Sequence, residues 1–483
     1  MTRTFGGTPD WVRDAVFYQV FPDRFAKSDR VAKAGNLETW DSPPTLAGYK
    51  GGDLLGVAER LDYLQDLGIT ALYLNPVFQS ASNHRYHTHD YYRVDPMLGG
   101  DAALRELIDS AHGRGMRVVL DGVFNHASRG FFQFNDLLES GRASAYLDWF
   151  HVRHFPLHAY GGGELGYDAW WNIAALPKFN TATPAVREFL FDVAEHWLRF
   201  GADGWRLDVP NEIDDDAFWR EFRARCRAVS PDAYIVGEIW DDAARWLIGD
   251  MFDGVMNYPL TRAIFGLVGR QIDHAELSRS GLNGIPALDA NGFAANLERL
   301  LHHHPSEAIA GQLNLLGSHD TPRLLSALGG DAVAARQALF LLFMLPGAPC
   351  LYYGDELGLS GGHDPHCRQA MPWGSHAGRD DDTFALVKSL TKLRAERTEL
   401  RRSATEVAGH GAGLVAIKRG EKVELTALLN VSDESAAVDQ RLLAAGRYKD
   451  LFDDRVIEQR AGDEAAALTV APRGWLLLER VPD

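Results

Sequence analysis

Four short segments of the sequence decide the fold: DGVFNH at residues 121–126, GWRLDV at 204–209, VGEIW at 236–240 and GSHD at 317–320. Each segment places polar or charged residues at the C-terminal end of a short apolar, β-branched run of the strand type. Charges are costly inside a core, but a parallel barrel collects its functional residues at the C-terminal ends of its strands. Four such segments in chain order therefore predict a barrel with a catalytic site at its mouth.

Strand-like runs alternate with amphipathic helical stretches along most of the chain, which is the pattern of successive βα units. The expected strands number eight, as a closed barrel of this type needs, at residues 15–21, 71–77, 117–123, 204–209, 234–239, 252–258, 312–317 and 350–355. Helical periodicity is expected between them at residues 54–67, 102–114, 184–200, 216–228 and 332–345. The predicted class is α/β, a (β/α)8 TIM barrel.

The barrel is predicted to carry two additions. We assign residues 1–125 and 182–402 to the barrel itself. Residues 126–181, rich in glycine and aromatics, form a connection too long for an ordinary loop, and we expect a subdomain inserted after strand 3 beside the active site. From residue 403 helical signals stop and short alternating runs take over, so residues 403–483 are predicted to form a C-terminal all-β sandwich domain.

The residue types in these segments indicate glycoside hydrolysis. Arg206 and Asp208 are two apart on one strand, so both side chains point to the same side, and the guanidinium is expected to lower the pKa of Asp208. That would keep the carboxylate ionised, as a nucleophile requires. The apolar neighbours of Glu238 disfavour its charged form, which suits a general acid. An ionised carboxylate beside a protonated one is the apparatus of glycoside hydrolysis, and Asp320 supplies a third carboxylate.

The four segments resemble the conserved regions of the α-amylase family, glycoside hydrolase family 13, and the resemblance covers nearly the whole chain. It implies that Asp208 is the nucleophile, that Glu238 is the acid/base and that Asp320 stabilises the transition state. It further implies hydroxyl contacts at the cleaved bond from His126, Arg206 and His319.

Other stretches narrow the resemblance to one subgroup. LPKFN at residues 176–180 is similar to the MPKLN region of neopullulanases, cyclomaltodextrinases and maltogenic amylases, and Asn211-Glu212 also fits that subgroup. Asn211 and Glu212 lie where an acceptor sugar would bind. Asp364 and Arg368, in DPHCR, match a pair that holds the next sugar outward on the non-reducing side.

Aromatic and histidine residues add further candidates for sugar contact. HRYHTHD at residues 84–90 looks like the family segment whose tyrosine, here Tyr86, stacks under the sugar ring that is cut, with His84 beside it. Trp170 and Trp240 serve packing and sugar stacking equally well, so both interpretations stay open. For His84 and Tyr86 the alternative is core packing, and for Asp364 with Arg368 it is a surface salt bridge.

Composition excludes several classes of partner. The formal net charge of −17 opposes binding to nucleic acid or to an anionic membrane, whereas a neutral α-glucan oligosaccharide is compatible with it. No run is long enough to span a bilayer and the N-terminus lacks a secretory core, so we expect a cytoplasmic protein. Three widely spaced cysteines are expected to be free thiols. Members of the subgroup usually dimerise through an N-terminal β-domain, for which Trp11 and the first strand leave no room, and we therefore expect a monomer.

No cofactor is expected, because no glycine-rich phosphate loop lies at a strand–helix junction. Many family members bind calcium through oxygen ligands. Here the loop at residues 26–33 carries two lysines and an arginine beside Asp29 and Asp53, which opposes a divalent ion, so tight calcium binding is not expected. The tract His302–His304 is interpreted as a solvated helix end before Pro305 rather than as a metal site.

The sequence therefore predicts a retaining hydrolase of α-1,4 bonds in maltooligosaccharides, cyclodextrins and related starch-derived glucans, with transglycosylation where a sugar replaces water. Two alternatives stay open. A glucosyltransferase or isomerase of the same family, such as a trehalose synthase, shares the first chemical step. A non-catalytic sugar-binding homologue would have lost the carboxylates that this chain keeps.

Overall fold

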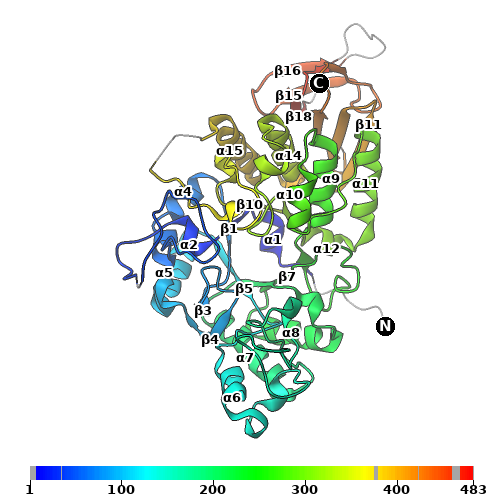
Figure 1. Ribbon diagram of the computed structural model, residues 1–483. Helices are drawn as coiled ribbons and strands as arrows, with labels where there is room; N and C mark the ends of the chain where they lie inside the picture. The colour runs from blue at the N-terminus through cyan, green and yellow to red at the C-terminus, as the bar shows by residue number, and fades with distance from the viewer. Residues whose placement is uncertain (1–6, 34, 375–378, 423, 460–467, 482–483) are drawn as a thin grey trace.

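The computed structural model describes residues 7–33, 35–374, 379–422, 424–459 and 468–481. The barrel strands and their helices occupy the middle of the molecule, the insertion with α6 (Phe132–Ser140) projects at the bottom of the view, and the C-terminal strands lie at the top (Figure 1). In the described part of the chain no helix is long and apolar enough to cross a membrane.

Eight parallel strands form the barrel, in the order β8-β7-β6-β5-β2-β1-β10-β9. Their bounds are β1 Phe17–Val20, β2 Ala71–Leu74, β5 Arg117–Gly122, β6 Gly204–Leu207, β7 Tyr234–Gly237, β8 Gly254–Val255, β9 Leu313–Leu315 and β10 Ala348–Tyr352. The sheet closes where Met256 forms a parallel bridge with Leu313 and the N–H of Asn257 donates to the carbonyl of Leu313 over 2.9 Å. The TIM-barrel prediction is confirmed.

The observed strands are shorter than the expected ones because the polar residues at their C-terminal ends leave the ladder. β6, for example, ends at Leu207, so Asp208 begins the loop that follows. β10 starts at Ala348 and pairs Pro349 with Asn314, whereas the sequence prediction placed the start two residues later. The side chains that matter for chemistry therefore stand at the barrel mouth, outside the paired sheet.

Five helical predictions correspond to observed helices: α3 Leu54–Ala58 with α4 Leu61–Asp66, α5 Gly100–His112, α7 Pro184–Arg199, α8 Asp216–Val229 and α14 Ala332–Met344. The first of them is interrupted at Arg60, whose φ of −107° and ψ of 7° are not helical. Helices α9 Tyr258–Val268, α11 Ala290–His303 and α15 Asp381–Glu396 lie where the sequence analysis predicted no helix.

The C-terminal part is all-β, as predicted. Six antiparallel strands form one sheet in the order β11-β12-β13-β18-β15-β16, with bounds Thr405–His410, Leu414–Arg419, Leu425–Asn430, Trp475–Val481, Gly446–Asp450 and Val456–Gln459. Alternate residues face opposite sides, so Val415 and Ile417 join the core of the barrel while Leu414 and Ala416 face a second apolar cluster. Among the described residues, the second layer holds only the short pair β14 (Ala436–Ala437) and β17 (Thr469–Val470).

The domain boundaries predicted at residues 125/126, 181/182 and 402/403 stay predictions. Parts of the predicted domains, namely residues 1–6, 34, 375–378, 423, 460–467 and 482–483, lie outside the described residues. Within the insertion, aromatic rings such as Phe134 and Tyr167 pack edge to face at 4.8 Å. Backbone bridges between His126 and Lys178 and between Phe150 and Phe179 also lie within the insertion, and the N–H of Phe179 donates to the carbonyl of Asn125 in the barrel over 3.1 Å.

Candidate active site

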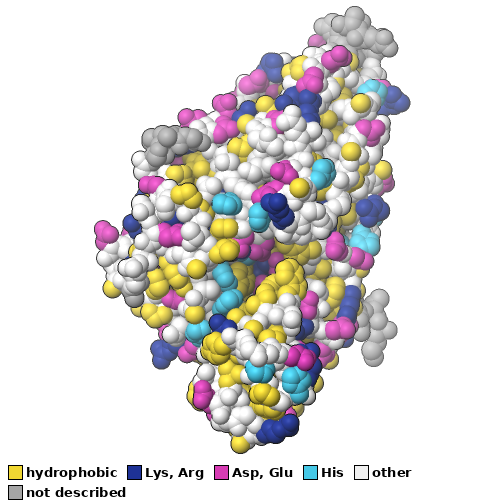
Figure 2. Space-filling view, viewed as in Figure 1, with side chains coloured by type: hydrophobic (Ala, Val, Ile, Leu, Met, Phe, Trp, Pro, Cys, Tyr) yellow, Lys and Arg dark blue, Asp and Glu magenta, His cyan; other side chains and the backbone are white. Residues whose placement is uncertain are grey.

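A fully buried guanidinium organises the polar residues at the barrel mouth. Arg206 Nη1 donates to Asp121 Oδ1 over 2.9 Å and to Asp208 Oδ1 over 3.1 Å, and its Nη2 lies 2.9 Å from Glu238 Oε1 in an ion pair. Three carboxylates from three neighbouring strands thus share one positive charge. The space-filling view shows a hollow with acidic side chains at its floor and histidine side chains along one wall (Figure 2).

The turn after Asp208 is strained in a way that completes this cluster. Val209 adopts φ 36° and ψ 51°, a left-handed conformation that β-branched residues avoid. In this conformation its N–H donates to Glu238 Oε2 over 3.2 Å, which joins the ends of β6 and β7. Such strain persists only where the surrounding structure imposes it, and it is concentrated at functional sites.

Burial changes the proton affinity of both central carboxyls. It raises the pKa of Glu238, as the sequence predicted. It also raises the pKa of Asp208, and the nearby charges of Glu238 and Asp121 add to this effect, so the lowering by Arg206 is outweighed. Arg206 acts to lower the pKa of Asp208, as expected, but burial reverses the expected net shift. The two carboxyls compete for one guanidinium in a dry site, and they titrate as a pair.

The pKa of the third carboxylate, Asp320, is shifted in the opposite direction. Asp320 Oδ2 lies 2.9 Å from His319 Nε2, and its Oδ1 accepts from Arg368 Nη2 over 3.1 Å. Although burial acts to raise the pKa of Asp320, His319 and Arg368 lower it below its usual range. Arg368 Nη1 also pairs with Asp364 Oδ1 at 3.1 Å, so the predicted Asp364–Arg368 pair is formed and reaches Asp320.

A hydrogen-bond chain fixes Tyr86 against His319. Gln19 Nε2 lies 2.8 Å from His319 Nδ1, and with the amide so oriented it donates, leaving the imidazole proton on Nε2. That Nε2 lies 2.7 Å from the hydroxyl of Tyr86, which itself donates to Asp121 Oδ2 over 2.7 Å. His84 lies beside this group, because its Nδ1 accepts from the backbone N–H of Tyr86 over 3.1 Å. Burial lowers the pKa of His84 well below its usual value, which keeps the ring neutral.

His126 carries an unpaired donor on the other wall of the site. Asn125 Nδ2 lies 3.2 Å from its Nδ1, while Nε2 is buried and has no hydrogen-bond partner among the described residues. Burial lowers its pKa to about 3, so the ring is neutral. Its ring stacks on Trp170 with centroids 5.4 Å apart, and Trp170 stacks on Trp171 at 4.6 Å. Trp171 is 77% exposed, so this stack leads from the buried site to the surface.

Trp240 contacts the predicted acid directly. Its Nε1 donates to Glu238 Oε1 over 3.2 Å, and its ring stacks on Tyr258 with centroids 3.8 Å apart and planes at 6°. The sequence left open whether Trp240 serves packing or sugar stacking. One face of its indole is used for packing, against Tyr258. The indole N–H meanwhile orients the Glu238 carboxyl.

Asn211 and Glu212 lie to one side of this cluster, in the 3-10 helix Pro210–Glu212. Glu212 Oε2 accepts from Lys178 Nζ over 2.9 Å, which joins two motifs that the sequence showed separately. Glu212 and Lys178 line a cavity of about 580 Å³ between the insertion and the barrel, whereas Asn211 is exposed.

Four residues of the site were not among the predicted candidates. Asp121 accepts from Arg206, Tyr86 and also Tyr73, whose hydroxyl donates to Asp121 Oδ2 over 2.8 Å. Gln19 orients His319, and Tyr258 supports Trp240. The signal was present for Asp121 and Gln19, because each is a polar residue within an apolar strand run.

The donor set does not fit calcium at the loop after β1. Asp53 Oδ2 accepts from the backbone N–H of Ser28 over 2.9 Å and from Lys33 Nζ over 2.8 Å. Lys33 Nζ also donates to the carbonyl of Met97 over 2.8 Å. An ammonium group therefore uses the buried oxygens that a hard cation would need.

Comparisons with known proteins agree with this geometry. The model for "Alpha amylase, catalytic domain" matches residues 19–413. The chain belongs to the alpha-amylase family. A cyclomaltodextrinase from Geobacillus thermopakistaniensis (strain MAS1) is 41% identical over 479 residues, covering 97% of this chain and 77% of that relative.

Solved structures similar to this chain cover it nearly from end to end. A crystal structure of a Thermus thermophilus protein superposes with a TM-score of 0.92 and 49% identity, covering 98% of this chain and 100% of that one. The cyclic α-maltosyl-(1→6)-maltose hydrolase from Arthrobacter globiformis gives a TM-score of 0.87 and 37% identity, covering 98% and 99%. The roles of the individual site residues remain predictions.

Proposed function

We propose that this alpha-amylase family member is a retaining α-glucan hydrolase that cleaves α-1,4-glucosidic bonds of maltooligosaccharides, cyclodextrins and related starch-derived glucans. The observation that carries the proposal is the contact of one guanidinium, Arg206, with both Asp208 and Glu238. Retaining enzymes hold their two carboxyls ~5–5.5 Å apart, whereas inverting enzymes leave ~6.5–9.5 Å for a water molecule. A shared guanidinium favours the shorter separation. Relatives named for cyclomaltodextrin and cyclic maltosyl-maltose hydrolysis support the substrate class.

The reaction proceeds in two displacements. In the first, Asp208 attacks the anomeric carbon while Glu238 gives its proton to the glycosidic oxygen, which leaves with the aglycone sugar. In the second, Glu238 takes a proton from water, the water oxygen attacks the anomeric carbon, and the bond to Asp208 breaks. Burial raises the pKa of both carboxyls, and the proposed cycle starts with the proton of the pair on Glu238 and with Asp208 ionised beside Arg206.

The surrounding groups are proposed to hold the reacting sugar. Asp320 stays ionised through His319 and Arg368 and accepts hydrogen bonds from sugar hydroxyls. The unpaired Nε2–H of His126 donates to a hydroxyl on the opposite side, where a sugar would satisfy it. The ring of Tyr86, held by its hydroxyl, supports the sugar from below.

The neighbouring sugars are assigned to two flanking groups. Asp364 with Arg368 holds the next sugar on the non-reducing side. On the acceptor side we assign Lys178 and Glu212, which line a polar cavity, together with the exposed Asn211. A sugar bound by these residues could replace the attacking water, which would give transglycosylation. A glucosyltransferase or isomerase differs from this proposal only in the acceptor that is used.

Cellular location and assembly complete the proposal. We place the enzyme in the cytoplasm, supported by three buried cysteines that are free. We propose a monomer and a reaction that needs no cofactor. Light scattering tests whether the enzyme is a monomer. Unchanged rates after exhaustive dialysis against a chelator would show that it needs no metal cofactor.

One experiment tests the function. The enzyme is incubated with maltotriose, maltoheptaose, cyclodextrins, pullulan and starch, and products are followed by chromatography and by NMR of the new reducing end. Linear products whose reducing end first appears as the α-anomer support the proposal. An initial β-anomer would mean inversion, accumulation of trehalose would mean an isomerase, and binding without turnover would mean a sugar-binding protein.

A further inference from the structure

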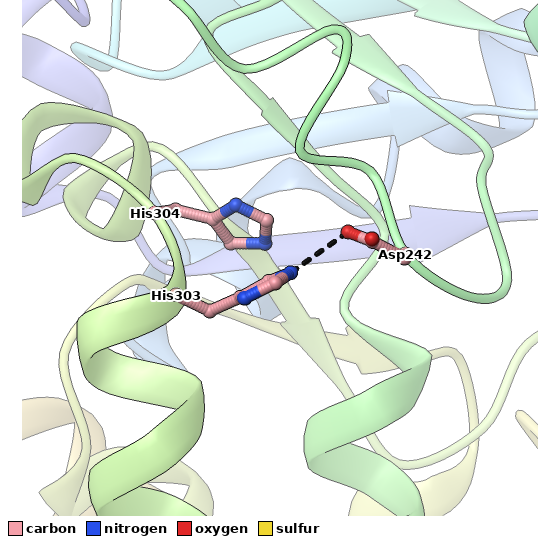
Figure 3. Close-up of side chains that lie close together, drawn as sticks. All are labelled: Asp242, His303 and His304. Carbon is pink, nitrogen blue, oxygen red and sulfur yellow. Dashed lines mark hydrogen bonds and ion pairs between the residues drawn. The ribbon is translucent and has the colours of Figure 1, made fainter.

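Three potential metal ligands meet outside the active site, at the end of helix α11 (Ala290–His303). His303 Nε2 lies 2.8 Å from Oδ1 of Asp242, which belongs to the loop after β7. The ligand atoms of Asp242, His303 and His304 all lie within 4.8 Å of one another. Figure 3 shows both imidazole rings and the carboxylate converging on one point from two separate elements.

The end of the helix explains why adjacent histidines face the same point. Neighbouring residues on a helix do not face each other. Here the helix ends at His303, and His304 turns to extended geometry with φ −122° and ψ 159°. The two rings therefore lie edge to face, with centroids 4.6 Å apart.

The imidazole of His304 has a nitrogen that forms no hydrogen bond within the described residues. Its Nδ1 is buried, and the part of the chain described by the structure offers it no hydrogen-bond partner. A buried polar atom without a partner in a native fold calls for an unseen water or ion.

The surroundings leave room for an ion and its water. The cluster lines a cavity of about 290 Å³ that also borders α9 and the start of β9. The adjacent carboxylate of Asp241 is engaged by Arg262, with Oδ1 and Nη1 3.1 Å apart. Within the described ranges Asp242 pairs with no arginine; its Oδ1 accepts from the backbone N–H of Ala244 over 2.9 Å and lies 2.8 Å from His303 Nε2.

We propose that Asp242, His303 and His304 bind one Zn²⁺ ion or a chemically similar divalent transition-metal ion. Two imidazoles and one carboxylate suit such an ion, whereas calcium and magnesium prefer all-oxygen sites. Zinc bonds to these atoms measure ~2.0–2.2 Å, so ligand atoms on one ion lie within about 4.4 Å. The present 4.8 Å spread therefore needs only a small side-chain adjustment. His303 Nε2 must be deprotonated to bind the ion, and its proton leaves to solvent.

A bound ion would connect the catalytic loop to α11. Asp242 follows Glu238 by four residues, and the carbonyl of Trp240 in between accepts from Arg262 Nη1 over 2.7 Å. The ion would thus join a segment that carries the predicted acid to a helix of the outer layer. Metal that binds only the folded chain also raises its thermal stability.

The test uses the full chain after dialysis against a chelator, titrated with ZnCl₂ in a calorimeter. We expect one ion per chain at this site, and we expect Asp242→Asn and His303→Gln each to weaken its binding at least 10-fold. The matched control is His302→Gln, because His302 is exposed and its Nδ1 lies 2.8 Å from the carbonyl of Glu298, away from the cluster. This control should bind zinc as the wild type does.

A thermal readout separates this site from other histidines. Zinc should raise Tm of the wild type and of His302→Gln, and should leave unchanged that of the double variant His303→Gln/His304→Gln. Turnover of maltotriose checks that each variant is folded. Equal zinc affinity in the double variant and the wild type, or the absence of binding by the wild type, would overturn the proposal.

Discussion

The guanidinium of Arg368 donates from Nη2 to Oδ1 of Asp320 over 3.1 Å. From the sequence, Arg368 was expected to pair with Asp364 and to hold a sugar beyond the cleaved bond. The structure gives the same guanidinium a second contact, with a carboxylate at the centre of the site. Outer sugar binding and the charge of Asp320 are therefore coupled through one side chain.

Arg368→Ala should consequently lower kcat as well as raise KM for maltotriose. A hydrogen bond to a charged group contributes ~1.5–3 kcal/mol, so kcat/KM should fall by about 10- to 100-fold. Asp364→Ala removes only the outer partner and should mainly raise KM. Steady-state kinetics of both variants measure the difference. An unchanged kcat in Arg368→Ala would show that the contact with Asp320 has no part in catalysis.

Asp208→Asn and Glu238→Gln should each abolish nearly all turnover and keep the fold. Each substitution is nearly isosteric and removes a group that acts in the transition state, so substrate binding need not be lost. Rates on maltotriose, with circular dichroism as the folding control, test both roles. Near-normal turnover in either variant would contradict the assignment of that carboxyl.

Trp240→Phe should move the alkaline limb of the pH–rate profile to higher pH. The indole N–H donates to Glu238 and favours its ionised form, so its removal raises an already raised pKa. The acid form is lost as pH rises through this pKa, and the limb should shift by up to about one pH unit. Trp170→Phe is the control, because the indole N–H of Trp170 has no partner among the described residues. A limb at the wild-type position in Trp240→Phe would show that this hydrogen bond does not tune the acid.

Lys33→Met should destabilise the protein, and calcium should not restore it. The substitution removes the ammonium donor from the Met97 carbonyl and from the buried Asp53 Oδ2, which keeps only the Ser28 N–H, at a cost of about 1–3 kcal/mol. Thermal unfolding measures the loss, and Lys27→Met, at an exposed lysine of the same loop, controls for the change in charge. A rise in wild-type Tm on addition of calcium would contradict the conclusion that the loop excludes the ion.

Trp171→Ala should weaken binding of long glucans more than short ones. The exposed indole extends the stack that begins at His126, and a lost aromatic contact is worth ~0.5–1.5 kcal/mol. KM for maltoheptaose should rise roughly two- to tenfold, with little change for maltotriose. Tyr160→Ala removes another exposed ring, one that packs under Arg129 instead, and serves as the control. An equal rise of KM for both substrates would indicate that Trp171 stabilises the fold and does not contact the longer glucan.

The sequence was sufficient for the barrel and for its central carboxylates because both depend on local patterns. Alternating strand and helix periodicity marks βα units, and a parallel barrel brings all strand ends to one face. Asp208, Glu238 and Asp320 could therefore be placed together without knowing any distance. Helix α9 begins at Tyr258, where the sequence prediction ended a strand, and no helix was expected there.

Only the tertiary structure decided how charges are shared. A sequence shows that Arg206 is two residues from Asp208, but not that Asp121 and Glu238 contact the same guanidinium. Nor does it show that burial raises the pKa of Asp208 by more than Arg206 lowers it. The pairing of Lys178 with Glu212, and of His303 with Asp242, likewise joins residues that are far apart in the chain. Desolvation and long-range contacts depend on what surrounds a side chain in space, and the local order of residues does not contain that information.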